Sequence, residues 1–220
     1  MLKEDIDDWV RFGGLLLHAT VREDDGSDKI KEDIREWVNE GGLLLHAAVE
    51  ESAKSTGSRS IVQVNLLLGQ GVMVDARNKH HATVLHVAAK SNNYVLMRIL
   101  SAPGRGADLH AKNMYGATPL HNASREGSRE IVSYLINAGS NIDALTDEGD
   151  TPLHQAVRKN KIENMTTLML AGANLQIKNH LGYFAKKLQC LQETKDAYRA
   201  AKLKIDSRPN AYNFHHQDVP

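Results

Sequence analysis

Apolar residues in the second half of the chain recur at helical spacing in short segments. One segment places four aliphatic side chains on a single helical face: Ile131, Val132, Leu135 and Ile136. A shorter apolar segment follows His121 just before it, and the stretch 143–146 after it is expected to form an extended connection. The pattern predicts a unit of helix, turn, helix and extended finger.

This unit recurs along the chain. Thr118-Pro119-Leu120-His121 returns thirty-three residues later as Thr151-Pro152-Leu153-His154. In three copies a glycine precedes the histidine by fifteen residues: Gly71 to His86, Gly106 to His121, and Gly139 to His154. A fixed period of this size is typical of repeat proteins, in which stacked copies of one small unit share a core. We therefore expect function to lie on a surface.

Threonine and proline mark the start of the first helix in each unit. Thr118 and Thr151 can cap the helix through the side-chain oxygen, and the prolines that follow suit the first helical position, where no backbone donor is needed. The earlier copy keeps the cap at Thr83 without a proline. A residue type that tolerates a left-handed turn stands between the two helices of each unit: Asn92, Gly127 and Asn160.

With these motifs, the segment from about Gly71 to Leu188 resembles ankyrin repeats. The residues that carry the resemblance are Gly116-Ala117-Thr118-Pro119-Leu120-His121, Gly149-Asp150-Thr151-Pro152-Leu153-His154, Gly106-Ala107-Asp108 and Gly172-Ala173-Asn174. The resemblance implies an all-α solenoid of stacked helix-turn-helix units with β-hairpin fingers. Two departures stand out. His81 replaces the glycine of the finger turn, and Asn164 replaces the apolar Ile131, so we expect a less regular turn and a weaker outer helix there.

The amino-terminal residues contain a second duplication. Trp9-Val10 and the segment 13–19 recur as Trp37-Val38 and the segment 41–47, at an offset of twenty-eight. We interpret these copies as irregular helix pairs without fingers. The predicted organisation is a single solenoid over residues 1–205, with irregular N-terminal helix pairs at 1–50, regular repeats at 51–177 and C-terminal capping helices at 178–205. Residues 206–220 are expected to form a flexible tail.

Charge is balanced overall and uneven along the chain. Lys and Arg number 27, as do Asp and Glu, yet residues 1–51 have a balance of minus eight and residues 178–208 one of plus five. Both ends are interpreted as solvated faces; the alternative is that the basic end contacts an acidic protein, an anionic membrane or nucleic acid. The basic end offers few aromatic platforms, so no nucleic-acid partner is expected.

Compartment and chemistry follow from what the sequence lacks. Cys190 is the single cysteine, the first residues do not resemble a secretory signal, and no stretch is long and apolar enough to span a membrane, so we expect a cytoplasmic protein, alternatively one in the cytosol of a host cell. We expect no catalytic residues, no cofactor and no metal. Five histidines occupy one equivalent position each and favour structural hydrogen bonds: His18, His46, His86, His121 and His154. Hidden catalysis at Cys190 or His215-His216 is the alternative.

The resemblance implies that the chain binds a partner protein through its finger tips and inner helices. At the finger tips the matching positions are Lys79, His80, Ala82, Met114, Tyr115, Ala117, Asp147, Glu148, Asp150, His180, Leu181 and Tyr183. On the inner helices they are Lys90, Ser91, Arg125, Glu126, Arg158 and Lys159. Tyr115 is either an energetic anchor for the partner or a cover for a neighbouring finger.

The predicted function is therefore a non-enzymatic adaptor, scaffold or inhibitor. The alternative is a host-directed effector of an intracellular bacterium or virus that uses the repeats to target a host protein. The partner's identity stays open, and a monomer is the favoured oligomeric state.

Overall fold

The computed structural model describes residues 45–50, 58–69, 72–91, 93–102, 104–105, 107–188 and 192–207. The chain forms two compact units, Met1–Met114 and Tyr115–Pro220. Most of the predicted N-terminal helix pairs, Cys190, and the tail from residue 208 with its two adjacent histidines lie outside the described residues.

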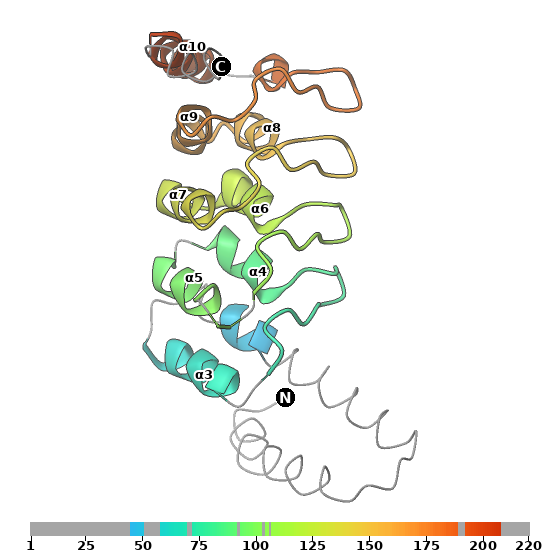
Figure 1. Ribbon diagram of the computed structural model, residues 1–220, viewed down its shortest axis with the longest axis vertical. Helices are drawn as coiled ribbons and strands as arrows, with labels where there is room; N and C mark the ends of the chain where they lie inside the picture. Colours follow the sequence, from blue (N-terminus) through green and yellow to red (C-terminus); the bar gives the residue numbers. More distant parts are fainter. Residues whose placement is uncertain are drawn as a thin grey trace, which may run out of the picture. The chain divides into compact units, whose positions relative to one another are not determined.

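The first unit contains three complete helices among its described residues. They are α3 (Ser58–Gly69), α4 (Val84–Lys90) and α5 (Tyr94–Leu100), and residues 45–50 are also helical (Figure 1). Helix α4 packs against α5. The α5 helix begins where the side chain of Asn93 accepts a hydrogen bond from the backbone N–H of Leu96 at 3.0 Å, which satisfies one of the unpaired donors of the first turn. Buried side chains from these elements form the core: Leu45, Val64, Leu67, Leu85, Leu96 and Leu100.

The second unit stacks helices in two layers. Its elements are α6 (Pro119–Glu126), α7 (Arg129–Asn137), α8 (Pro152–Arg158), α9 (Ile162–Leu170), the 3-10 helix η1 (Ala185–Leu188) and α10 (Gln192–Asp206). Helix α6 packs on α8 and α8 on η1 in the inner layer; α7 packs on α9 and α9 on α10 in the outer layer (Figure 1). The core between the layers is aliphatic: Leu120, Ile131, Leu135, Leu153, Met165 and Leu168 are fully buried. The chain is thus an all-α repeat protein in its described part.

The fingers are ordered loops, and the predicted β-hairpins are not confirmed. Among the described residues the only β-type pairing is an isolated antiparallel bridge between Lys178 and Phe184. In unit 2 the fingers project from the inner layer, away from α7 and α9 (Figure 1).

Threonine and histidine cap the first helix of each repeat together. The backbone N–H groups of Thr83, Thr118 and Thr151 donate to Nδ1 of the histidine three residues later, at 3.1, 3.1 and 3.2 Å. At α8 the hydroxyl of Thr151 also accepts from the backbone N–H of His154, which completes the reciprocal cap. The predicted threonine cap is therefore confirmed there, and the histidine adds a second half that the sequence pattern alone did not predict.

Two turn predictions need correction. His81 adopts a φ of +55°, close to the +69° and +75° of Gly116 and Gly149, so the first finger makes the same turn without glycine. Gly127, in contrast, has a φ of −72° and a ψ of 179°, which is extended backbone. Asn160, at the equivalent place in the next repeat, has a φ of +54° as predicted.

Asn164 is also more than a weak substitute for an apolar residue. It is buried on α9, and its Nδ2 lies 3.2, 3.2 and 3.0 Å from the carbonyl oxygens of Ala123, Ser124 and Gly127. These oxygens lie at the carboxyl end of α6, where the last carbonyl groups lack partners within the helix; that of Ala123 also accepts from the N–H of Gly127 at 2.8 Å. The expected weakening of the outer helix thus overlooked a polar contact that links α9 to the end of α6.

Candidate partner-binding surface

Backbone hydrogen bonds join neighbouring finger tips. In unit 2 the N–H of Asp147 donates to the carbonyl oxygen of Tyr115 at 3.1 Å, and the N–H of His180 donates to that of Glu148 at 2.9 Å. In unit 1 the N–H of Met114 donates to the carbonyl oxygen of His80 at 3.1 Å. The same pair of positions is used each time, so neighbouring tips are joined in the same way within each unit.

In the fingers of Asn78 and Asn179, the asparagine side chain closes the turn that follows it. The Oδ1 atom of Asn78 accepts from the N–H groups of His80 and Ala82, at 2.9 and 3.1 Å. Oδ1 of Asn179 likewise accepts from Leu181 and Tyr183, at 3.1 and 3.0 Å. These short polar side chains bond their own backbone as in an Asx turn. The recurrence of asparagine before the finger turn was the sequence signal for this role, and it was missed.

Glycine lets the tips approach one another. A Cβ atom added to Gly149 would lie 2.8 Å from Cδ2 and 3.0 Å from the backbone nitrogen of His180. At Gly116 an added Cβ would lie 2.7 Å from the backbone nitrogen of Asp147. Both glycines also have positive φ angles, which favour glycine, and the close approach of the next tip leaves no space for a Cβ atom.

Buried histidines attach the fingers to the inner helices of unit 2. Nε2 of His121 lies 3.0 Å from the carbonyl oxygen of Asp150, and Nε2 of His154 lies 3.0 Å from that of Tyr183. Because Nδ1 accepts from a backbone N–H, the neutral ring carries its proton on Nε2, and Nε2 donates to the finger carbonyl. His46 in unit 1 makes the equivalent contact with the carbonyl oxygen of Ala76 at 2.9 Å. Of the five equivalent histidines, His46, His121 and His154 therefore have a structural role.

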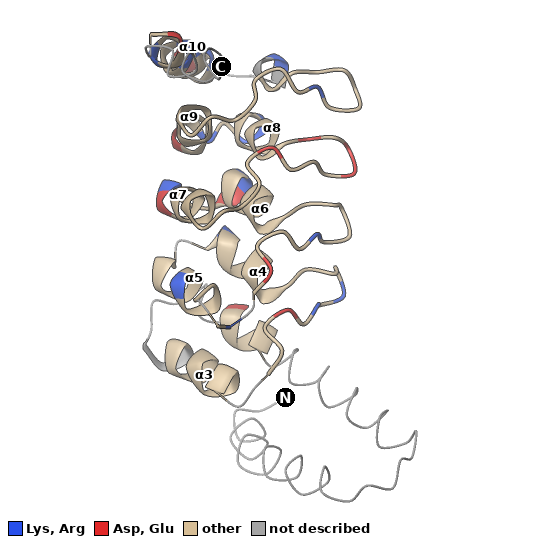
Figure 2. Ribbon diagram, viewed as in Figure 1, with Lys and Arg blue, Asp and Glu red and all other residues tan. Residues whose placement is uncertain are grey.

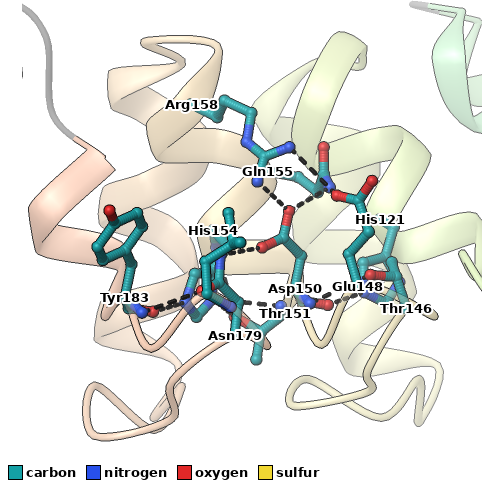
Figure 3. A network of polar contacts seen from close by, with 11 residues as sticks. His121, Thr146, Glu148, Asp150, Thr151, His154, Gln155, Arg158, Asn179 and Tyr183 are labelled. Carbon is teal, nitrogen blue, oxygen red and sulfur yellow. Dashed lines mark hydrogen bonds and ion pairs between the residues drawn. The ribbon is translucent and has the colours of Figure 1, made fainter.

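Asp150 is the centre of a buried polar network, shown in Figure 3. Its Oδ2 lies 2.6 Å from a guanidinium nitrogen of Arg158 and accepts from the Gln155 amide at 3.0 Å, and its Oδ1 accepts from the Asn179 amide at 2.9 Å. Three donors therefore compensate a carboxylate that is fully removed from solvent. Glu148 lies at the edge of the network, 3.6 Å from Arg158.

The structure places most of the predicted surface residues at the surface, with three corrections. Ala82, Ser91 and Asp150 are buried, because the first two pack at the ends of α4 and the third holds the network together. The other predicted residues of unit 1 are exposed: Lys79, His80, Lys90 and Met114. Those of unit 2 that are exposed are Tyr115, Glu126, Asp147, Glu148, Arg158, Lys159, His180, Leu181 and Tyr183, while Ala117 and Arg125 are partly exposed.

Unit 2 has an acidic finger and paired arginines on its inner helices. Acidic residues gather on the finger that precedes α8, as the red ribbon of Figure 2 shows. On the inner helices Arg125 pairs with Glu126 at 2.8 Å, and Arg158 pairs with Asp150. Both guanidinium groups are therefore partly neutralised by their neighbours.

The described part of the chain was also searched for metal-binding clusters and for membrane-spanning helices. No group of three or more His, Cys, Asp and Glu side chains there is arranged to hold a metal ion. No helix there has the length and apolar character needed to cross a membrane.

Comparison with known families agrees with these repeating features. Residues 96–179 match the family model described as ankyrin repeats (3 copies). A search of curated proteins returned no match. Ankyrin repeats are generally protein–protein interaction modules and form a non-enzymatic fold. The matched segment, with its shared caps, finger turns and histidine contacts, therefore consists of ankyrin repeats.

Proposed function

We propose that the chain is a non-enzymatic binding protein whose unit 2 docks a partner protein on its finger tips and on the exposed side of α6 and α8. The observation that carries this proposal is the combination of a fixed frame with exposed apolar side chains. Tyr115, Leu181 and Tyr183 are 62%, 73% and 44% exposed on fingers whose backbones are joined by hydrogen bonds.

A fixed frame favours binding because little conformational freedom is lost when the partner docks. The fingers are held at their base by His121 and His154 and at their tips by the N–H groups of Asp147 and His180. Exposed tyrosine on such a frame offers a large apolar area with few rotatable bonds, which is typical of residues that dominate interface energies.

The inner helices supply a polar border to this surface. Arg125 and Arg158 each keep more than a third of their side chain exposed while their guanidinium groups are held by carboxylates. A held guanidinium can still donate to a partner through its remaining N–H groups, in a fixed direction.

The test is affinity purification with mass spectrometry on the full chain. Wild type is compared with the double variant Tyr115→Ala/Arg125→Ala and with the control Leu203→Ser, which removes an exposed apolar side chain from α10, away from the fingers. We expect the double variant to lose the captured partner and the control to keep it, with unchanged thermal melting in both.

Equal capture by the double variant would show that the partner uses another surface. The identity of the captured protein then decides between adaptor, scaffold, inhibitor and host-directed effector, because these roles differ in the partner and share the surface.

A further inference from the structure

Tyr115, Glu148 and Leu181 occupy the same position in three consecutive fingers, and we call them the fingertip row. In unit 2 the carbonyl groups of Tyr115 and Glu148 accept the finger-to-finger hydrogen bonds, and Leu181 follows His180 at the third tip as Glu148 follows Asp147 at the second. The three glycines that follow the row all have φ between +69° and +75°. The row is therefore built on one repeated turn.

All three side chains of the fingertip row face solvent. Tyr115 is 62% and Leu181 is 73% exposed, and the Glu148 side chain is 76% exposed. The row thus presents an apolar group, a carboxylate and a second apolar group in order. None of these side chains is part of the hydrophobic core. An aromatic or aliphatic group so exposed on a fixed backbone gains by being covered.

The charge at the middle of the row is negative. The tip segment 147–150 also carries Asp147 and the buried Asp150, and the guanidinium of Arg158 lies closest to Asp150, at 2.6 Å. The three carboxylates of this segment and the Arg158 guanidinium together give a balance of minus two. Arg158 lies 3.6 Å from Glu148 and closer to the buried Asp150, whose charge it offsets, so the net negative charge remains on the exposed Asp147 and Glu148.

Taken together with the proposed function, on which this inference rests, the geometry points to a partner segment that is extended, basic in the middle and apolar on both sides. Packed helices lie about 8–10 Å apart, and α6, α8 and η1 pack in succession beneath the row. A segment in the extended polyproline II conformation has three residues per turn and rises about 3.1 Å per residue, so every third side chain faces the same side, about 9 Å from the next. Successive tips therefore correspond to about every third residue of the bound segment, with Arg or Lys over Glu148.

The probe is the capped peptide Leu-Ser-Ser-Arg-Ser-Ser-Leu, titrated at up to millimolar concentration into the isotope-labelled full chain and followed by NMR. The comparison peptide replaces Arg by Glu. We expect saturable shifts at the amide signals of the fingertip row, with binding of the Glu peptide weaker by about tenfold or more because like charges then face each other.

Variants of the protein test whether the carboxylate of Glu148 causes the preference for the Arg peptide. Glu148→Gln should weaken the Arg peptide about two- to fivefold, the range of a single exposed ion pair, and more salt should reduce the difference. Glu163→Gln is the matched control, since it removes an exposed carboxylate from α9, away from the fingers. Leu181→Ser should weaken both peptides about equally.

The inference is overturned if the Arg peptide does not bind, if both peptides bind equally, or if Glu148→Gln binds like wild type. These results are separable from a failure of the proposed function. If Tyr115→Ala/Arg125→Ala loses its captured partner while Glu148→Gln keeps it, the docking surface stands and the basic segment is rejected.

Discussion

The side-chain amide of Asn164 donates to the carbonyl oxygen of Gly127 at 3.0 Å, so a single polar side chain on α9 occupies the end of α6. The same Nδ2 atom lies 3.2 Å from two further carbonyl oxygens. In the preceding repeat the equivalent position holds the fully buried Ile131. The two repeats therefore use one site in opposite ways, as an apolar contact and as a helix end cap.

Asn164→Ile should destabilise the protein although it adds apolar volume. The substitution removes the side-chain donor to the carbonyl groups of Ser124 and Gly127, at a cost of about 1–3 kcal/mol, while that of Ala123 keeps the N–H of Gly127. Urea unfolding measures the loss. Thr166→Ile is a control on the same helix, because its hydroxyl bonds only the carbonyl of Glu163 within α9 among the contacts described. A stabilised Asn164→Ile variant would mean that apolar burial outweighs the cap.

Gly149→Ala should cost more than Gly172→Ala. Both glycines have positive φ, at +75° and +99°, so both variants carry the backbone strain of about 1–2 kcal/mol. Only at Gly149 would the new methyl group press on His180, since nothing lies within 4 Å of an added Cβ at Gly172. The difference between their unfolding free energies isolates the close approach of two fingers. Equal losses would contradict that requirement.

Asp150 and Arg158 should be strongly coupled. A double-mutant cycle with Asp150→Asn and Arg158→Gln is expected to give a coupling free energy above about 1 kcal/mol, because the carboxylate is fully buried and loses its charged partner. The exposed pair Asp196 and Arg199 on α10, at 3.2 Å, is the control and should give about 0.2–1 kcal/mol. Similar values in the two cycles would show that burial adds little.

His154→Ala should destabilise unit 2 by about 2–5 kcal/mol. The change removes the acceptor of the Thr151 N–H and the donor to the Tyr183 carbonyl, and it leaves both groups with unmet hydrogen bonds. The exposed His180→Ala is expected to change stability by less than about 0.5 kcal/mol. Chemical denaturation of both variants makes the comparison, and a small effect at His154 would argue against the capping role of the ring.

Acid should weaken the fold through His46. Burial lowers the pKa of His46, and this effect is partly opposed by the hydrogen bond to Ala76 and by the charge of Glu50. The unfolded chain therefore takes up the proton first: the stability given by neutral His46 is complete above the unfolded pKa of about 6.5 and is lost as pH falls through the lowered folded pKa. The urea midpoint of wild type should fall more steeply with acidification than that of His46→Gln. If the urea midpoints of the two proteins fall in parallel with pH, His46 does not contribute to the acid sensitivity.

Local features of the fold could be predicted from the sequence, and contacts between repeats could not. The period, the aliphatic faces and the cap at Thr151 depend on residues close together in the chain, and these were predicted. The burial of Asp150 depends on Asn179, twenty-nine residues away, and the role of Asn164 depends on carbonyl groups about forty residues away. Neither can be derived from helical spacing.

The finger turns show the same limit. Glycine at two of the turns suggested that His81 would disturb the third, yet Asn78 closes that turn by accepting two backbone N–H groups, and His81 takes the left-handed conformation. For the candidate site, the sequence predicted the exposed tips correctly at Tyr115 and Leu181. The sequence could not predict which charged residues pair with other side chains of the same chain, because such pairing depends on distances between side chains.

Hydrogen bonds between main-chain atoms join one finger tip to the next, and the outward side chains of the fingertip row take no part in these bonds. An exchange of these side chains therefore leaves the bonds between the tips in place. A library randomised at three sites could therefore retarget unit 2 to new ligands without redesign of its helices.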